Sequence, residues 1–303
     1  MTDTQKPESA PARPPESIVV GVDSDEPSAL AARWAALRAA SHGSTIELVT
    51  AIDELVNDPL EVAERLRAVT AAVLGVSPGL QVTTAVIEGS IRNVLMQRAE
   101  TADLLVLGFH RSRPIRSLLT GEVALAIAAE SVCPTVVVPE DWDEKDARGP
   151  VLVGMEVDGS SDAALEFAAT EALDGRELHL VHAWRLPPSS VDALEALIVE
   201  RPQDIAWHRK LLAEAADGLR DAFPGVAVRE QLTESFPAAA LIQEARRCSL
   251  VVVGSHGRGE LGSLLLGSTA RDVMRNTATP VCVVPRPDDE APRRHNGRVS
   301  QTV

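Results

Sequence analysis

The chain has 303 residues, a length typical of two domains, and 45% of its residues are hydrophobic although only 3% are aromatic and none is tyrosine. Its cores must therefore be aliphatic, which suits parallel sheets covered by alanine-rich helices. The net charge of −15 argues against nucleic acids and anionic membranes as main partners, because an acidic surface repels both. The sequence shows neither a signal-peptide core nor a run of about 18 apolar residues, so we expect a cytoplasmic protein that binds no nucleic acid and no membrane.

The predicted elements begin after a polar N-terminal tail, residues 1–16, and end before a similar tail, residues 287–303; both tails lack periodicity and are predicted to be disordered. Behind the first tail, short β-branched runs alternate with amphipathic segments rich in Ala and Leu. This alternation predicts strands and helices in turn. The predicted strands of this first copy are 17–23, 46–52, 103–108 and 134–139, and the predicted helices are 28–40, 60–74, 90–99 and 121–130.

A charged linker, residues 140–149, separates this unit from a second copy of the same pattern. We therefore predict two domains, the first copy at 17–140 and the second copy at 150–286. The second copy carries about 13 extra residues after Trp184, and the sequence leaves the role of this insertion, 185–202, open. Its matching strand segments are 150–156, 178–184, 249–254 and 280–285.

Strands that alternate with helices at this spacing imply right-handed crossovers and a parallel sheet. Each copy is predicted to be an α/β domain with a doubly wound parallel sheet of about five strands and four helices. Such sheets bind ligands beyond the carboxyl ends of their strands, where the winding reverses. Four glycines lie there: Gly21, Gly108, Gly154 and Gly254.

Two kinds of residue that often mark function are assigned to the structure instead. The cysteines Cys133, Cys248 and Cys282 lack metal-ligand spacing and lie in or beside apolar runs, so we expect them to be small buried side chains. His179 and His182 are three residues apart on a strand and thus face opposite ways, so they do not form a metal pair. Contact of His182 with a ligand is left open beside a structural role. The sequence predicts no metal site and offers no catalytic constellation.

The second copy contains a glycine pattern suited to phosphates. Gly254 and Gly257 follow a strand and leave no Cβ between a phosphate and the backbone N–H groups. Ten residues further on, Gly267 precedes Ser268 and Thr269, which open a helix whose free N–H groups and dipole favour an anion. A plainer interpretation is that the glycines only permit turns and Ser268 caps the helix. A Walker-type phosphate loop is excluded because Ser268 stands where its lysine would be.

The whole pattern, G-x2-G-x9-G-[ST] in its strand-loop-helix context, resembles the nucleotide-binding branch of the universal stress protein family. The resemblance covers residues 17–139 and 150–285 and implies two tandem domains of the adenine nucleotide alpha hydrolase-like type. It implies that ATP, with or without Mg²⁺, binds the second copy. The residues implied to contact it are Gly154, Glu156, Ala183, Gly254, His256, Gly257, Arg258, Gly267, Ser268 and Thr269.

The first copy departs from this pattern at two positions. Arg111 replaces Gly257, and Glu122 replaces Ser268 and places a carboxylate where phosphates would sit. We therefore expect the first copy not to bind ATP. Arg111, Arg113 and Arg116 are interpreted as surface charges, with binding of another anion left open.

Three functions remain open from the sequence. The preferred one is a nucleotide-dependent stress-response regulator; the others are a slow ATPase and a non-nucleotide scaffold built as an internal pseudo-dimer. The apolar last strands, 134–139 and 280–285, are predicted to pair the two domains within one chain, because exposed apolar edges are a liability. Association of two chains into a homodimer is possible on the same grounds.

Overall fold

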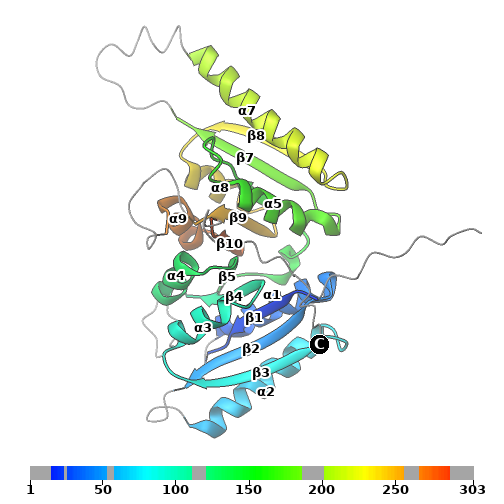
Figure 1. The fold of residues 1–303 in the computed structure, drawn as a ribbon, viewed down its shortest axis with the longest axis vertical. Coiled ribbons are helices and arrows are strands. Elements are labelled where there is room, and N and C mark those ends of the chain that lie inside the picture. Colours follow the sequence, from blue (N-terminus) through cyan, green and yellow to red (C-terminus); the bar gives the residue numbers. More distant parts are fainter. Residues whose placement is uncertain are drawn as a thin grey trace, which may run out of the picture.

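The computed structural model describes residues 15–23, 26–52, 58–110, 121–185, 201–255 and 266–286. Within them, strands and helices alternate as the sequence predicts (Figure 1). The α/β class with two tandem parallel-sheet domains is confirmed. The first copy contains β1 (Ser17–Gly21), α1 (Glu26–His42), β2 (Thr45–Ile52), α2 (Pro59–Val76), β3 (Val82–Glu88), α3 (Ile91–Ala99), β4 (Leu104–Phe109), α4 (Gly121–Glu130) and β5 (Thr135–Pro139).

The second copy repeats this order after a linker that holds one short 3-10 helix, η1 (Glu144–Asp146). Residues 186–200 of the insertion lie outside the described residues, as do both tails apart from Pro15 and Glu16. The elements of the second copy are β6 (Val151–Gly154), α5 (Asp162–Glu171), η2 (Ala172–Asp174), β7 (Leu178–Trp184), α7 (Arg201–Ala222), β8 (Val228–Glu234), α8 (Pro237–Ala245), β9 (Leu250–Gly254), α9 (Ser268–Asn276) and β10 (Val281–Val284).

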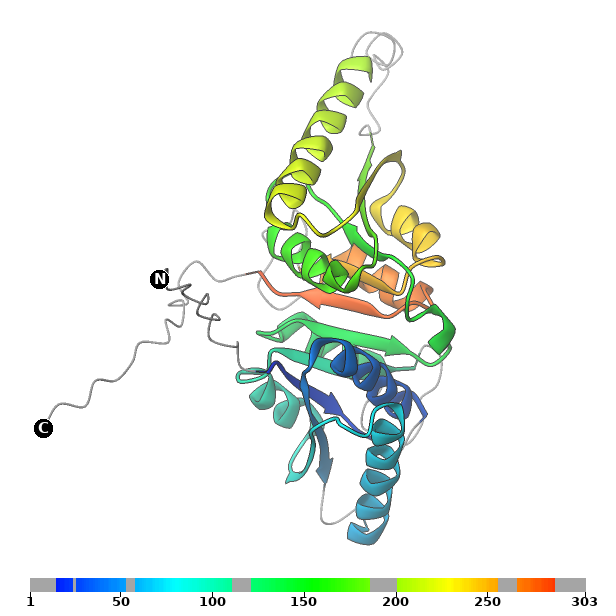
Figure 2. The ribbon, with the colours of Figure 1, turned by 90° about the vertical axis from the view of Figure 1, so that its right-hand side faces the viewer.

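The ten strands form one sheet in the order β3-β2-β1-β4-β5-β10-β9-β6-β7-β8. Within each copy the neighbouring strands are parallel. At the seam β10 pairs with β5 antiparallel, with Cys282 opposite Val136 (Figure 2). The two last strands therefore lie in the centre of the sheet, and β3 and β8 form its outer edges. In the second copy the winding reverses between β9 and β6, so a crevice is expected at their carboxyl ends.

Two hydrophobic cores lie on the two faces of this sheet, and each continues across the seam. One is built by α1, α2, α5 and α7, and the other by α3, α4, α8 and α9. Cys133, Cys248 and Cys282 are buried in these cores, as expected. Burial raises the pKa of all three thiols, that of Cys248 to about 12, so they stay protonated and poorly nucleophilic at neutral pH.

A buried ion cluster joins the two copies on the α1 face. The Arg38 guanidinium of α1 donates to Glu171 of α5 at 2.5 and 3.0 Å and to Glu16 at 2.5 and 3.0 Å. Arg38 and Glu171 are 7% and 1% exposed. Glu16 also accepts a hydrogen bond from the Ser44 hydroxyl, so this residue belongs to the fold and its assignment to the N-terminal tail was wrong. The cluster fixes α1 of one copy against α5 of the other.

Candidate functional site

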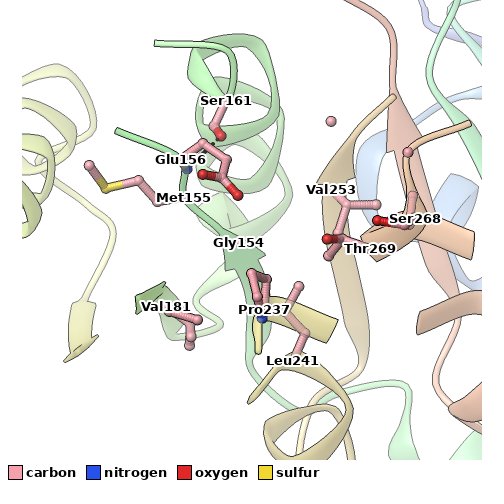
Figure 3. A pocket seen from close by; sticks show the side chains of 14 residues that line it. Gly154, Met155, Glu156, Ser161, Val181, Pro237, Leu241, Val253, Ser268 and Thr269 are labelled. Carbon is pink, nitrogen blue, oxygen red and sulfur yellow. Dashed lines mark hydrogen bonds between the residues drawn. The ribbon is translucent and has the colours of Figure 1, made fainter. Parts of the chain in front are cut away.

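A pocket lies where the crevice is expected, at the carboxyl ends of β9, β6 and β7 (Figure 3). Its volume is about 610 Å³ when the open solvent at its mouth is included. Seven of the ten sequence-predicted site residues line it, whereas His256, Gly257 and Arg258 lie outside the described residues. The seven are Gly154, Glu156, Ala183, Gly254, Gly267, Ser268 and Thr269.

The first turn of α9 forms one wall of the pocket. Gly267 is the N-cap, no side chain caps the helix, and the first helical hydrogen bond runs from Arg271 N to Gly267 O at 3.1 Å. The N–H groups of the three residues before Arg271, which are Ser268, Thr269 and Ala270, therefore lack acceptors within the helix. Ser268 and Thr269 bring their hydroxyls to the same wall. The N-cap is Gly267, so the interpretation that Ser268 serves only to cap the helix does not apply. The free N–H groups and the two hydroxyls make this wall suited to an anion.

A serine that the sequence analysis did not select faces this wall from the start of α5. Ser161 Oγ accepts a hydrogen bond from the backbone N–H of Glu156 at 2.9 Å, and both residues line the pocket (Figure 3). The first copy has the same turn, because Ser28 Oγ accepts from Asp23 N at 3.0 Å. The signal was present in the sequence: each serine follows the terminal glycine of its strand by seven residues. The turn fixes the backbone that carries the Glu156 carboxylate.

The opposite end of the pocket is apolar. Val181 and Ala183 of β7 contribute to it, together with Pro237 and Leu241 of α8. Figure 3 shows Val181, Pro237 and Leu241 gathered away from the hydroxyls of α9. One end of the pocket therefore offers N–H and O–H donors and the other offers a flat apolar surface.

His182 does not line the pocket but supports it from behind. It is 1% exposed, with its Nδ1 3.0 Å from Met155 O and its Nε2 2.9 Å from Nδ1 of His208 on α7. His179 contacts Glu177 at 2.7 Å and lies 4.0 Å from Cys248 Sγ, on the other face of the strand. Both histidines have structural partners. Among the described residues no group of three or more metal-ligating side chains is present.

The corresponding strand end and helix start of the first copy are closely packed. A Cβ on Gly108 would lie 2.5 Å from the backbone of Pro27, so the first turn of α1 rests directly on the end of β4. A Cβ on Gly121 would lie 2.5 Å from His110 O and 3.1 Å from the ring of Phe109, which is buried. Phe109 occupies the position held by Ser255 in the second copy. In the first copy the first turn of α1 and the Phe109 ring thus lie close to the end of β4 and the start of α4. These two positions correspond to the strand end and the helix start that flank the pocket of the second copy.

Glu122 lies in a different place from the one expected. Its side chain is 80% exposed and pairs with Arg275 of α9, across the seam, whereas the sequence analysis put its carboxylate in the phosphate position. The Glu122 carboxylate turns toward the seam because Arg275 of the second copy offers a cation to the exposed start of α4. Arg111, Arg113 and Arg116 lie outside the described residues.

Replacing Gly108 with alanine tests the contact that packs α1 against β4. The added Cβ meets backbone atoms at 2.5 Å, so we expect a loss of about 1–3 kcal/mol of unfolding free energy. Gly75→Ala in α2 is the matched control, because its Cβ meets nothing within 4 Å and alanine favours a helix. Urea denaturation measures both, and equal stabilities of the two variants would refute the close contact.

The fold and the pocket define the class of protein: a doubly wound α/β protein with a ligand pocket at the point where its sheet reverses. The family model described as the universal stress protein family matches residues 15–139 and 148–285. The chain therefore belongs to the universal stress protein family.

Similar proteins agree over nearly the full length. A universal stress protein of Mycolicibacterium smegmatis is 31% identical over 286 residues, covering 88% of this chain and 96% of that protein. One of Mycobacterium tuberculosis is 29% identical over 288 residues, covering 88% and 95%. The crystal structure of a universal stress protein from Archaeoglobus fulgidus has a TM-score of 0.65 at 18% identity, covering 89% of this chain and 98% of that chain, which supports the fold. No helix in the described part of the chain is long and apolar enough to cross a membrane.

Proposed function

We propose that the second copy binds ATP in the pocket at the ends of β6, β7 and β9, and that the protein acts as a nucleotide-dependent stress-response regulator. The observation that carries this proposal is the division of one pocket into a donor-rich end at α9 and an apolar end at β7 and α8. A nucleotide has the same division between its phosphates and its base.

The residues present fit such a ligand. The N–H groups of the first turn of α9, together with the hydroxyls of Ser268 and Thr269, suit phosphate oxygens. The Glu156 carboxylate stands on the opposite wall and repels phosphates, so it suits the ribose hydroxyls, to which it offers acceptors. The apolar end suits the base.

Slow ATP hydrolysis is the second candidate function. Among the described lining residues Glu156 is the one carboxylate that could accept a proton from water, and no lysine or histidine is present there to assist it. A scaffold without nucleotide is the other alternative. A homodimer remains a proposal; because β5 and β10 already pair with each other, a second chain would have to associate through another surface.

The ligand is tested on the purified full-length chain. We expect mass spectrometry of the denatured protein to release ATP or ADP. We also expect millimolar ATP with Mg²⁺ to raise the melting temperature, since a ligand at 100 times its dissociation constant adds about 2.7 kcal/mol to the stability. Chain that carries no nucleotide and gains no thermal stability would instead favour the scaffold, and phosphate release above background would favour the ATPase.

A further inference from the structure

Two side chains lie next to the apolar end of the pocket. Arg185 directly follows Trp184, the last residue of β7, and is two residues beyond Ala183, which lines the pocket. The Arg185 guanidinium lies over the ring of Phe236, 3.6 Å from its centroid. Phe236 is the N-cap of α8 and directly precedes Pro237, another lining residue. The pair thus joins the ends of two elements, β7 and α8, that both contribute lining residues.

This pair is exposed to solvent. The Phe236 side chain is 63% exposed, and Arg185 is exposed as well. An exposed phenylalanine alone is an ordinary surface feature. Here the cation-π contact joins the end of a strand to the start of a helix and orders two flat groups beside the apolar end of the pocket. Aromatic rings and guanidinium planes are the groups on which nucleic-acid bases stack in proteins.

We propose that Phe236 and Arg185 form a stacking platform that completes the base end of the pocket and selects purine over pyrimidine nucleotides. The inference rests on the proposed function and deepens it. The bicyclic base of a purine reaches beyond Ala183 and Pro237 to cover the platform, whereas a pyrimidine ring is shorter and gains less. The platform acts on the base alone, because the phosphates are held at α9.

The experiment compares ATP with CTP, both with Mg²⁺, by calorimetric titration of the full chain. For Phe236→Ala we expect about tenfold weaker ATP binding, the order of one lost base-aromatic contact, and less than twofold weaker CTP binding. Phe236→Trp should restore the preference for ATP. Arg185→Ala should weaken ATP binding in the same direction. Leu173→Ala is the matched control, since Leu173 is also an exposed apolar residue of the second copy, 55% exposed, but does not line the pocket.

The outcomes separate this inference from the function on which it rests. If the wild-type chain binds ATP and Phe236→Ala keeps the wild-type ratio of ATP to CTP affinity, the platform is overturned while nucleotide binding stands. If the wild-type chain binds neither nucleotide, the proposed function fails and the platform fails with it. Without nucleotide, the melting temperatures of the Phe236 and Arg185 variants should equal that of the wild type, because both side chains are exposed. Equal melting temperatures would show that the variants fold.

Discussion

Replacing Ser268 with glutamate is expected to weaken ATP binding by at least tenfold while leaving the fold intact. The change puts into the second copy the residue that the first copy has at the matching position, Glu122. Ser268 is exposed in the first turn of α9, where an acidic side chain is compatible with the helix and favoured by its dipole. Folding should therefore be unaffected or slightly stabilised.

Binding should suffer for an electrostatic reason. A carboxylate about 4 Å from one phosphate charge costs about 1–4 kcal/mol, depending on solvation, and ATP carries several such charges. We expect the affinity to fall by at least tenfold, measured by calorimetric titration with ATP and Mg²⁺. The matched control is Glu122→Ser, which loses only an exposed ion pair with Arg275 and should leave ATP affinity unchanged. Equal affinity of Ser268→Glu and the wild type would show that the phosphates lie elsewhere.

Replacing Arg38 with methionine is expected to produce the largest loss of stability. The change leaves Glu171, 1% exposed, without its closest cation, and removal of one partner from a buried ion pair costs about 3–5 kcal/mol. Urea or thermal denaturation measures the loss. Glu171→Leu added to Arg38→Met should recover much of it, because an apolar pair does not leave a buried charge.

Arg33→Met on the same helix is the control for this prediction. Arg33 pairs with Glu144 at the surface, and an exposed pair contributes less than about 1 kcal/mol. If Arg38→Met costs no more than Arg33→Met, the cluster does not hold the two copies together.

The cluster also predicts a dependence on pH. Burial by itself raises the pKa of Glu16, but the hydrogen bonds and charge of Arg38 outweigh it, so the pKa lies below its ordinary value of 4.5. A carboxyl whose pKa is lowered in the folded chain stabilises the fold above its unfolded pKa, and this contribution disappears as the pH falls through the folded value. The stability difference between the wild type and Arg38→Met should therefore narrow as the pH falls below about 4.5.

The location of the pocket could be predicted from the sequence because parallel strands place their carboxyl ends at one edge. Gly154 and Gly254 end two such strands, Ala183 is the last residue but one of a third, and Gly267 precedes the next helix. The strands that alternate with helices settle the topology, and the topology brings these residues together. Whether ATP binds there stays a prediction.

The apolar end of the pocket could not be located in the same way. Pro237 and Leu241 belong to α8, which follows β8, and no residues were assigned to the third strand of either copy. Both β3 and β8 are outer strands whose side chains are largely exposed or half-buried, so their sequences lack the apolar runs that mark the inner strands.

Contacts between distant elements account for the remaining differences. Arg38 and Glu171 are 133 positions apart and become partners only because β5 and β10 pair and bring α1 against α5. The packing of Phe109 on Gly121 and of Pro27 on Gly108 likewise depends on how closely helices approach strand ends. The sequence analysis explained the altered first copy by the Arg111 side chain and the Glu122 charge, and it did not predict these contacts.

The stoichiometry of ATP binding to the intact chain tests the central claim, that one copy binds nucleotide and the other does not. Titration calorimetry should give one ATP per chain for the wild type and for Glu122→Ser, and at least tenfold weaker binding for Ser268→Glu. Two ATP molecules per wild-type chain would contradict the account, and so would a single site of unchanged affinity in Ser268→Glu.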